Sequence, residues 1–241
     1  MKNITCVLGA ETKKIFQKKE FLFGLILVFI MGCGMVYGVY EYPDSFGIQN
    51  VAAFYGNFSS ILILFLAAKV LGEEFDLKTF TFVFSSKCNR GEIYTAKIIS
   101  VTLCCLIIGM FGGILHNTAL ILCNQEWDII TIVRNVVYTA GAYALYGYVA
   151  AAGAILLTTF VKNTIMPFIY LIILYWVFPG ILELVTEKII VLDKVSNLIA
   201  FSFADDFIMY QTYTWQTILV LLLNGTLFYI LSLWAVKKRD L

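Results

Sequence analysis

The stretch LGEEFDLKTFTFVFSSKCNRGEIYTAK, residues 71–97, interrupts a strongly apolar sequence with acids, lysines and an arginine. Apolar runs flank it at 51–71 and 98–123. Each run is long enough to cross a bilayer as a helix, which takes roughly 20 mainly apolar residues. Charge at such density is too costly inside hydrocarbon. The stretch therefore separates two membrane spans and indicates a polytopic, helical membrane protein.

The composition of the whole chain agrees with this class. Of its 241 residues, 61% are hydrophobic and 14% are charged, and the mean hydropathy is +0.87. A soluble domain has roughly 45–50% apolar and about 25% charged residues, so a water-soluble globule is excluded. We expect an all-α fold, a single transmembrane domain over 1–241, with six spans at 21–40, 51–71, 98–123, 135–161, 165–186 and 215–236.

The basic residues predict the orientation, because cationic loops resist translocation and stay in the cytoplasm. Of the 17 lysines and arginines, all except Arg134, Lys188 and Lys194 fall on the side that holds both termini and residues 72–97. We therefore expect a multi-pass protein of the cell membrane with both termini in the cytosol.

Residues 1–20, ahead of the first span, are expected to form an amphipathic surface helix along the inner leaflet. Three apolar residues share one helical side, whereas Glu11 and Lys18 intrude on it. The alternative is a solvated basic leader that only fixes the topology. The apolar residues are Ile4, Leu8 and Ile15.

Residues 187–214, between the fifth and sixth spans, are too apolar for a free loop. Irregular backbone is not tolerated against lipid, so we expect an extracellular helical hairpin. It is either a lid over a transport path or a packed cap that plugs the bundle. The candidate residues for a cargo path or external gate are His116, Asn117, Phe203, Asp205 and Asp206.

Other features favour packing over chemistry. Glycines spaced four apart, at 34 and 38 and at 109 and 113, let helices approach closely. The six cysteines form no C-x-x-C pair and read as small buried hydrophobes. The chain has no P-loop and no H-E-x-x-H, and the adjacent Asp205 and Asp206 have no second acidic cluster. We therefore expect no catalytic residue, no metal and no cofactor bound by this chain.

The opening stretch also carries an apolar surface between its acidic start and its basic end. Phenylalanines exposed to the cytosol need a cover, either the inner leaflet or another protein. The acids where the chain leaves the membrane argue against burial in an anionic leaflet. A protein partner is thus favoured, with aromatic residues as anchors and charges for orientation.

At these residues the chain resembles the permease subunits of ABC-2 type transporters, which include bacitracin and lantibiotic export or self-protection permeases. The family pattern is an acid, a Gly-Thr, a Pro, an Arg and then a Lys that opens the third span. Lys78 stands in place of the Gly and Lys87 in place of the Pro, while the other positions match: Glu74, Thr79, Arg90 and Lys97. The layout of the spans and the basic ending AVKKRDL, residues 235–241, are similar as well.

The resemblance implies that residues 72–97 contain a coupling helix that docks on a separate cytosolic ATPase. Two ATPase copies, which bind the ATP and Mg, would drive two permease subunits, identical or homologous. The cargo would be an amphipathic or hydrophobic molecule such as an antimicrobial peptide, and we expect no nucleic-acid partner. The implied contact residues are Glu73, Glu74, Thr79, Phe80, Phe82, Phe84 and Arg90. Each of them could instead hold the loop against the chain's own spans.

Two other function classes remain open. A membrane enzyme acting on lipid would use His116 or the Asp205 and Asp206 pair and would need no ATPase. A non-transporting immunity or scaffold protein would capture a toxic peptide at the external hairpin.

Overall fold

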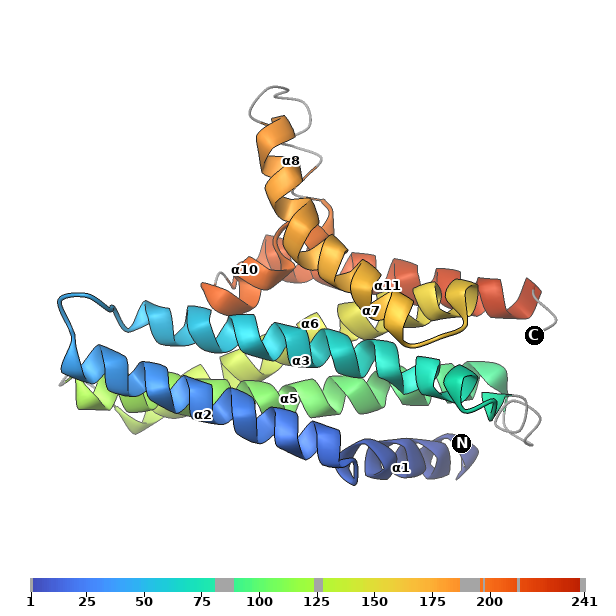
Figure 1. Ribbon diagram of the computed structural model, residues 1–241, viewed down its shortest axis with the longest axis horizontal. Coiled ribbons are helices and arrows are strands. Elements are labelled where there is room, and N and C mark those ends of the chain that lie inside the picture. Colours follow the sequence, from blue (N-terminus) through green and yellow to red (C-terminus); the bar gives the residue numbers. More distant parts are fainter. Residues whose placement is uncertain are drawn as a thin grey trace.

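The computed structural model describes residues 2–80, 89–123, 128–186, 196, 198–211 and 213–238. All regular structure in these residues is helical (Figure 1). The elements are α1 (Lys2–Phe16), α2 (Lys19–Glu41), α3 (Gln49–Asp76), α5 (Arg90–Leu122), α6 (Ile129–Val161), α7 (Ile165–Ile172), the π-helical η1 (Ile173–Val177), α8 (Phe178–Thr186), the 3-10 turn η2 (Ala200–Ser202), α10 (Ala204–Met209) and α11 (Trp215–Lys238).

Six segments of the described residues are long and apolar enough to cross a membrane. They match the six expected spans, so the prediction of an all-helical protein with six such helices is confirmed. The segments are α2, α3, α5, α6, the run from α7 to α8, and α11 up to Ala235.

Two spans extend further into the charged stretch than predicted. α3 continues beyond the apolar run to Asp76, and α5 begins at Arg90 rather than at residue 98. Hydropathy marks only the part of a helix that lipid surrounds, whereas backbone hydrogen bonding continues until a cap ends it. Asn89 and Glu92 form a capping box at the start of α5, with the Asn89 side chain accepting from the Gly91 N–H at 3.2 Å. Much of the predicted coupling region is therefore a continuation of the two spans.

α5 and α6 pack without side chains between their backbones at two glycines. A Cβ on Gly109 would lie 2.8 Å from Cα of Ala140, and one on Gly113 would lie 2.8 Å from Cα of Val136. These glycines therefore serve close packing within the chain, as predicted. The pair in the first span differs, since a Cβ on Gly34 or Gly38 would meet no atom of the described residues within 4 Å.

α1 packs against the chain's own α5 (Figure 1). Ile15 is buried, and the Thr12 and Ser100 hydroxyl oxygens are 3.1 Å apart. A helix is therefore present where the sequence predicted one, and part of its surface is covered by protein.

The fifth span is broken by the π-helical turn η1. α7 packs on α3 and α6, whereas α8 rises away from the bundle in Figure 1 and buries none of its residues. The chain then returns through η2 and α10, where Met209 lies against Gly56 of α3. Of the predicted external hairpin, residues 187–195, 197 and 212 lie outside the described residues. The remainder holds the two short helices η2 and α10.

Both termini lie at one end of the bundle, beside the end of α3 and the start of α5 (Figure 1). We call this the terminal end. The connection between α2 and α3 lies at the opposite end, which we call the far end.

Candidate functional site

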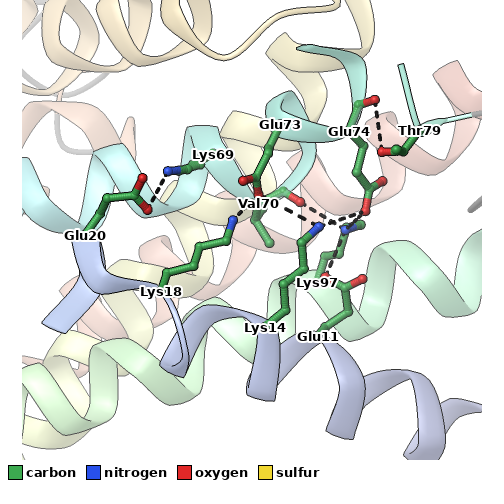
Figure 2. A network of polar contacts seen from close by, with 10 residues as sticks. All are labelled: Glu11, Lys14, Lys18, Glu20, Lys69, Val70, Glu73, Glu74, Thr79 and Lys97. Carbon is green, nitrogen blue, oxygen red and sulfur yellow. Dashed lines mark hydrogen bonds and ion pairs between the residues drawn. The ribbon is translucent and has the colours of Figure 1, made fainter. Parts of the chain in front are cut away.

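A fully buried lysine joins three helices at the terminal end. Nζ of Lys97, on α5, lies 2.5 Å from Oε1 of Glu74 and donates to the Val70 carbonyl oxygen at 3.0 Å, both on α3. It also lies 3.0 Å from Oε2 of Glu11 on α1 (Figure 2). One ammonium group thus holds α1, α3 and α5 in a fixed register.

Two further lysines form ion pairs with the glutamates at the end of α3. Nζ of Lys14 lies 3.7 Å from Oε1 of Glu74 and 3.9 Å from Oε2 of Glu73. Lys18, just after α1, forms an ion pair and hydrogen bond with Glu73. Burial lowers the pKa of Lys18, and the bond to the Glu73 carboxylate opposes that shift. The last turn of α1 and the residues after it are therefore tied to the end of α3.

The outermost pair of the cluster joins α2 to α3. Nζ of Lys69 lies 2.8 Å from Oε2 of Glu20, whose side chain is 60% exposed. The four lysines of Figure 2 thus face four glutamates, and the cluster is neutral as a whole. We call these eight side chains the ionic cluster: Glu11, Lys14, Lys18, Glu20, Lys69, Glu73, Glu74 and Lys97.

Buried ion pairs give less stability than their geometry suggests, because each ion loses its hydration. Breaking such a pair is nevertheless costly, since an uncompensated charge is left inside. The ionic cluster therefore specifies how the helices meet at the terminal end.

α3 ends in a turn whose geometry requires a left-handed residue. The Lys78 N–H donates to the Phe75 carbonyl at 3.0 Å and the Thr79 N–H donates to the Glu74 carbonyl at 2.9 Å. These two bonds form a Schellman motif, in which the left-handed position is usually a glycine. Lys78 occupies it with a φ of 57°. The lysine thus adopts the backbone conformation that glycine favours at helix ends.

Some of the predicted contact residues are buried within the chain, and others are exposed at its surface. Glu74 and Phe80 are buried, and the Phe80 ring stacks on Phe75 at 4.3 Å between centroids. Glu73 is partly buried in the ionic cluster. For these three the geometry favours the intrachain role over a surface contact. Phe82 and Phe84 lie outside the described residues.

The exposed surface at this end is small and of mixed character. Leu77 is 63% exposed, between the exposed Asp76 and Lys78. Thr79 and Arg90 are exposed too, so two predicted contact residues do reach the surface. We call the exposed side chains of residues 76–79 and Arg90 the rim. Residues 77–79 of the rim directly follow α3, whose last turn carries Glu74, and Arg90 opens α5, the helix that carries Lys97.

A second polar site lies between η1 and α10. Oδ1 of Asp205 accepts a hydrogen bond from the Tyr146 hydroxyl of α6 at 2.7 Å. Asp205 and Asp206 line a cavity of about 250 Å³ together with Tyr175 and Trp176. We call this the Asp205 cavity. It brings two of the predicted gate residues together.

The other gate candidates lie elsewhere. Asn117 donates to the Ile132 carbonyl at 3.0 Å and accepts from the Asn135 side chain at 3.1 Å, which joins α5 to α6. His116 is partly buried beside it, and neither residue lines the Asp205 cavity. Phe203 precedes α10, and its carbonyl accepts from the Phe207 N–H at 2.9 Å. These contacts fit a role in packing.

Sequence reasoning missed Glu11 and Lys97 as partners and overlooked Tyr146 and Tyr175. A signal existed for the first pair, because a charge on the apolar side of an amphipathic helix needs a buried counter-ion. No signal marked the two tyrosines, since their position beside Asp205 depends on the return of α10 to the bundle.

No protein-family model matches the chain, and no curated protein matches it. Its class is therefore defined by its own structure. In the residues that the structure describes, it is an all-helical protein with six helices long and apolar enough to cross a membrane.

Proposed function

We propose that this chain is the membrane-spanning permease subunit of an ATP-binding-cassette exporter of the ABC-2 type. The observation that carries the proposal is the position of the rim. The rim lies where α3 ends and α5 begins, and Lys97 joins these two helices to α1 through Glu74 and Glu11. A force applied at the rim therefore reaches three helices at once.

The conformation of Lys78 removes one objection to the resemblance. Lys78 departs from the glycine of the family pattern, yet it adopts the left-handed backbone that a glycine would supply. Two other residues of the pattern, Glu74 and Lys97, are in direct contact at 2.5 Å. The pattern thus describes a local structure with a physical reason for its spacing.

In the proposed complex, two permease subunits, identical or homologous, bind two cytosolic ATPase subunits. The ATPases bind the ATP and Mg²⁺ and contact the rim, with both permease termini in the cytosol. Closure of the ATPases would shift the equilibrium of the spans between two arrangements. The cargo is an amphipathic or hydrophobic molecule such as an antimicrobial peptide.

The proposal is tested at Arg90, which is exposed and has no role in the ionic cluster. Arg90→Glu should abolish co-purification with the proposed partner ATPase and should abolish ATP-dependent transport, without lowering the melting temperature. Arg134→Glu, which reverses an exposed charge near the start of α6 and at the far end of the bundle, is the matched control. The proposal fails if Arg90→Glu and Leu77→Asp both leave co-purification and transport as in Arg134→Glu.

A peptide-capturing immunity protein is a second candidate, favoured by the Asp205 cavity. It predicts protection of cells that persists when the partner ATPase cannot hydrolyse ATP. No observation favours a lipid-modifying enzyme, because His116 does not line the cavity that holds Asp205.

A further inference from the structure

We propose that the Asp205 cavity binds a cationic nitrogen group, an ammonium or guanidinium, carried by an amphipathic ligand. This binding requires no ATPase and goes beyond the transport cycle. Only the identification of the ligand as cargo rests on the proposed function.

The cavity is lined by two carboxylates that the described residues leave without a basic partner. Asp205 accepts from Tyr146, and neither Asp205 nor Asp206 forms an ion pair with any lysine or arginine in the described part of the chain. In the part of the chain that the structure describes, the titratable groups that interact with these two carboxylates are all acidic or neutral. Those groups are Glu183 of α8, Tyr175 of η1, and Tyr143 and Tyr146 of α6. A ligand that brings a positive charge would satisfy this arrangement.

A second, independent observation is the hydroxyl of Tyr175. The side chain is 1% exposed and lines the cavity, yet its oxygen has no hydrogen-bond partner among the described residues. A buried polar atom without a hydrogen-bond partner destabilises the folded protein, because it has lost its contact with water. A phenol oxygen can accept from the N–H of an ammonium or guanidinium group. Tyr175 and Asp205 thus line the same space.

The walls of the cavity fit an organic cation better than a metal ion. Aromatic rings at Tyr175, Trp176 and Phe201 line it, and cations bind favourably over such faces. Pro179 and Met209 add apolar surface for an alkyl chain. Mg²⁺ and Ca²⁺ need about six oxygen ligands or retained waters, and an aromatic wall supplies neither.

The ionisation of Asp205 adds a pH dependence. Burial raises the pKa of Asp205 to about 7, and the nearby Asp206 raises it further, while the bond from Tyr146 opposes the shift. The carboxyl group is therefore largely neutral below that pH and charged above it. An alkylammonium ion keeps its charge over this range, so binding should tighten as the pH rises from 6 to 8.

The test is a binding measurement on the full chain in phosphatidylcholine nanodiscs, without any ATPase. The probes are octylammonium and the neutral octanol, and calorimetry at pH 8 measures the binding of each. We expect saturable octylammonium binding that Asp205→Asn weakens by about tenfold or more, and that Tyr175→Phe weakens severalfold. Octanol should bind the wild type and Asp205→Asn equally.

Asp128→Asn, which removes an exposed acid ahead of α6, is the matched control and should leave octylammonium binding unchanged. Tyr175→Phe keeps the ring, so it tests the site even if Asp205→Asn folds poorly. The inference is overturned if both cavity variants bind octylammonium as Asp128→Asn does, or if octanol competes equally with octylammonium. Such a result leaves the ATPase contact untouched, since that contact is tested separately at Arg90.

Discussion

Glu74 and Asp205 are both carboxyl groups held inside the same bundle, yet their surroundings are opposite. Glu74 is almost fully buried and faces Lys97 at 2.5 Å and Lys14 at 3.7 Å. Asp205 has a tyrosine hydroxyl as its donor and a second acid as its neighbour in sequence. The first carboxylate is neutralised by the chain, and the second has no counter-ion among the described residues.

The difference shows how a buried charge can be interpreted. A charge that its own chain neutralises fixes helices relative to one another, as the ionic cluster does. A charge left without a counter-ion shifts its pKa toward the neutral form and is available to a ligand. The terminal end is thus built for rigidity, and the Asp205 cavity for binding.

The strongest way to break this comparison is to remove the central lysine. Lys97→Met leaves the carboxylates of Glu74 and Glu11 inside without their shared partner, and should lower the stability by about 3–5 kcal/mol. Scanning fluorimetry in detergent measures the change, with the exposed Lys13→Met as control. Adding Glu74→Gln to Lys97→Met should recover part of the loss. A melting temperature equal to that of Lys13→Met would contradict the structural role.

Removing the charge at Asp205 should stabilise the protein instead, because its carboxyl has a raised pKa in the folded protein. Its stabilising contribution is therefore fully present below about pH 4 and is lost as the pH rises through about 7. Asp205→Asn stays neutral throughout, so its melting temperature should exceed that of the wild type at pH 8 and match it near pH 4. Melting temperatures across this range decide the matter, with Asp128→Asn as control. Parallel curves for the wild type and Asp205→Asn would refute the shift.

A smaller loss is expected at Glu11, the more accessible of the two carboxylates on Lys97. Glu11→Gln keeps the shape but weakens a charged hydrogen bond, and should cost about 1–2 kcal/mol. Because Glu11 ties α1 to α5, trypsin should also cut faster after Lys13 and Lys14. Glu41→Gln, at the exposed end of α2, is the control. Equal cleavage rates in both variants would show that α1 is held by other contacts alone.

The smallest effect is expected at the edge of the ionic cluster. Lys69 and Glu20 are 2.8 Å apart, but Glu20 is largely exposed. Solvent and salt weaken such a pair, so Lys69→Met should change the stability by no more than about 0.5–1 kcal/mol. A loss as large as that of Lys97→Met, in the same melting assay, would mean that the stability contributed by these ion pairs does not increase with their burial.

The spans could be predicted from the sequence because each needs only a run of apolar residues. Their ends could not be predicted equally well, since the extension of α5 to Arg90 depends on a cap at Asn89. That cap carries a sequence signal, an Asn followed three residues later by a Glu. The close packing at Gly109 also followed from spacing alone, whereas the same spacing at Gly34 serves no close packing against the described residues.

The two polar sites were harder to predict, because both depend on contacts between distant segments. Lys97 looked like the basic end of a loop, but its ammonium group lies between three helices and contacts Glu11, which is 86 positions away in the sequence. Tyr146 reaches Asp205 across 59 positions. Nothing in the local pattern encodes such a meeting. The charges at Glu11 and Lys18 on an apolar helix side were the only local trace.

The π-helical turn at Ile173–Val177 adds a residue to one turn of the fifth span. The extra residue rotates the later side chains of the fifth span about the helix axis, relative to the side chains of α7. Deleting one residue here would restore an α-helical repeat and rotate Trp176 and Pro179 by roughly 100° about the helix axis. Homologues with an insertion or a deletion at this turn would then accept different ligands, even with the same residue types at the positions that line the cavity here.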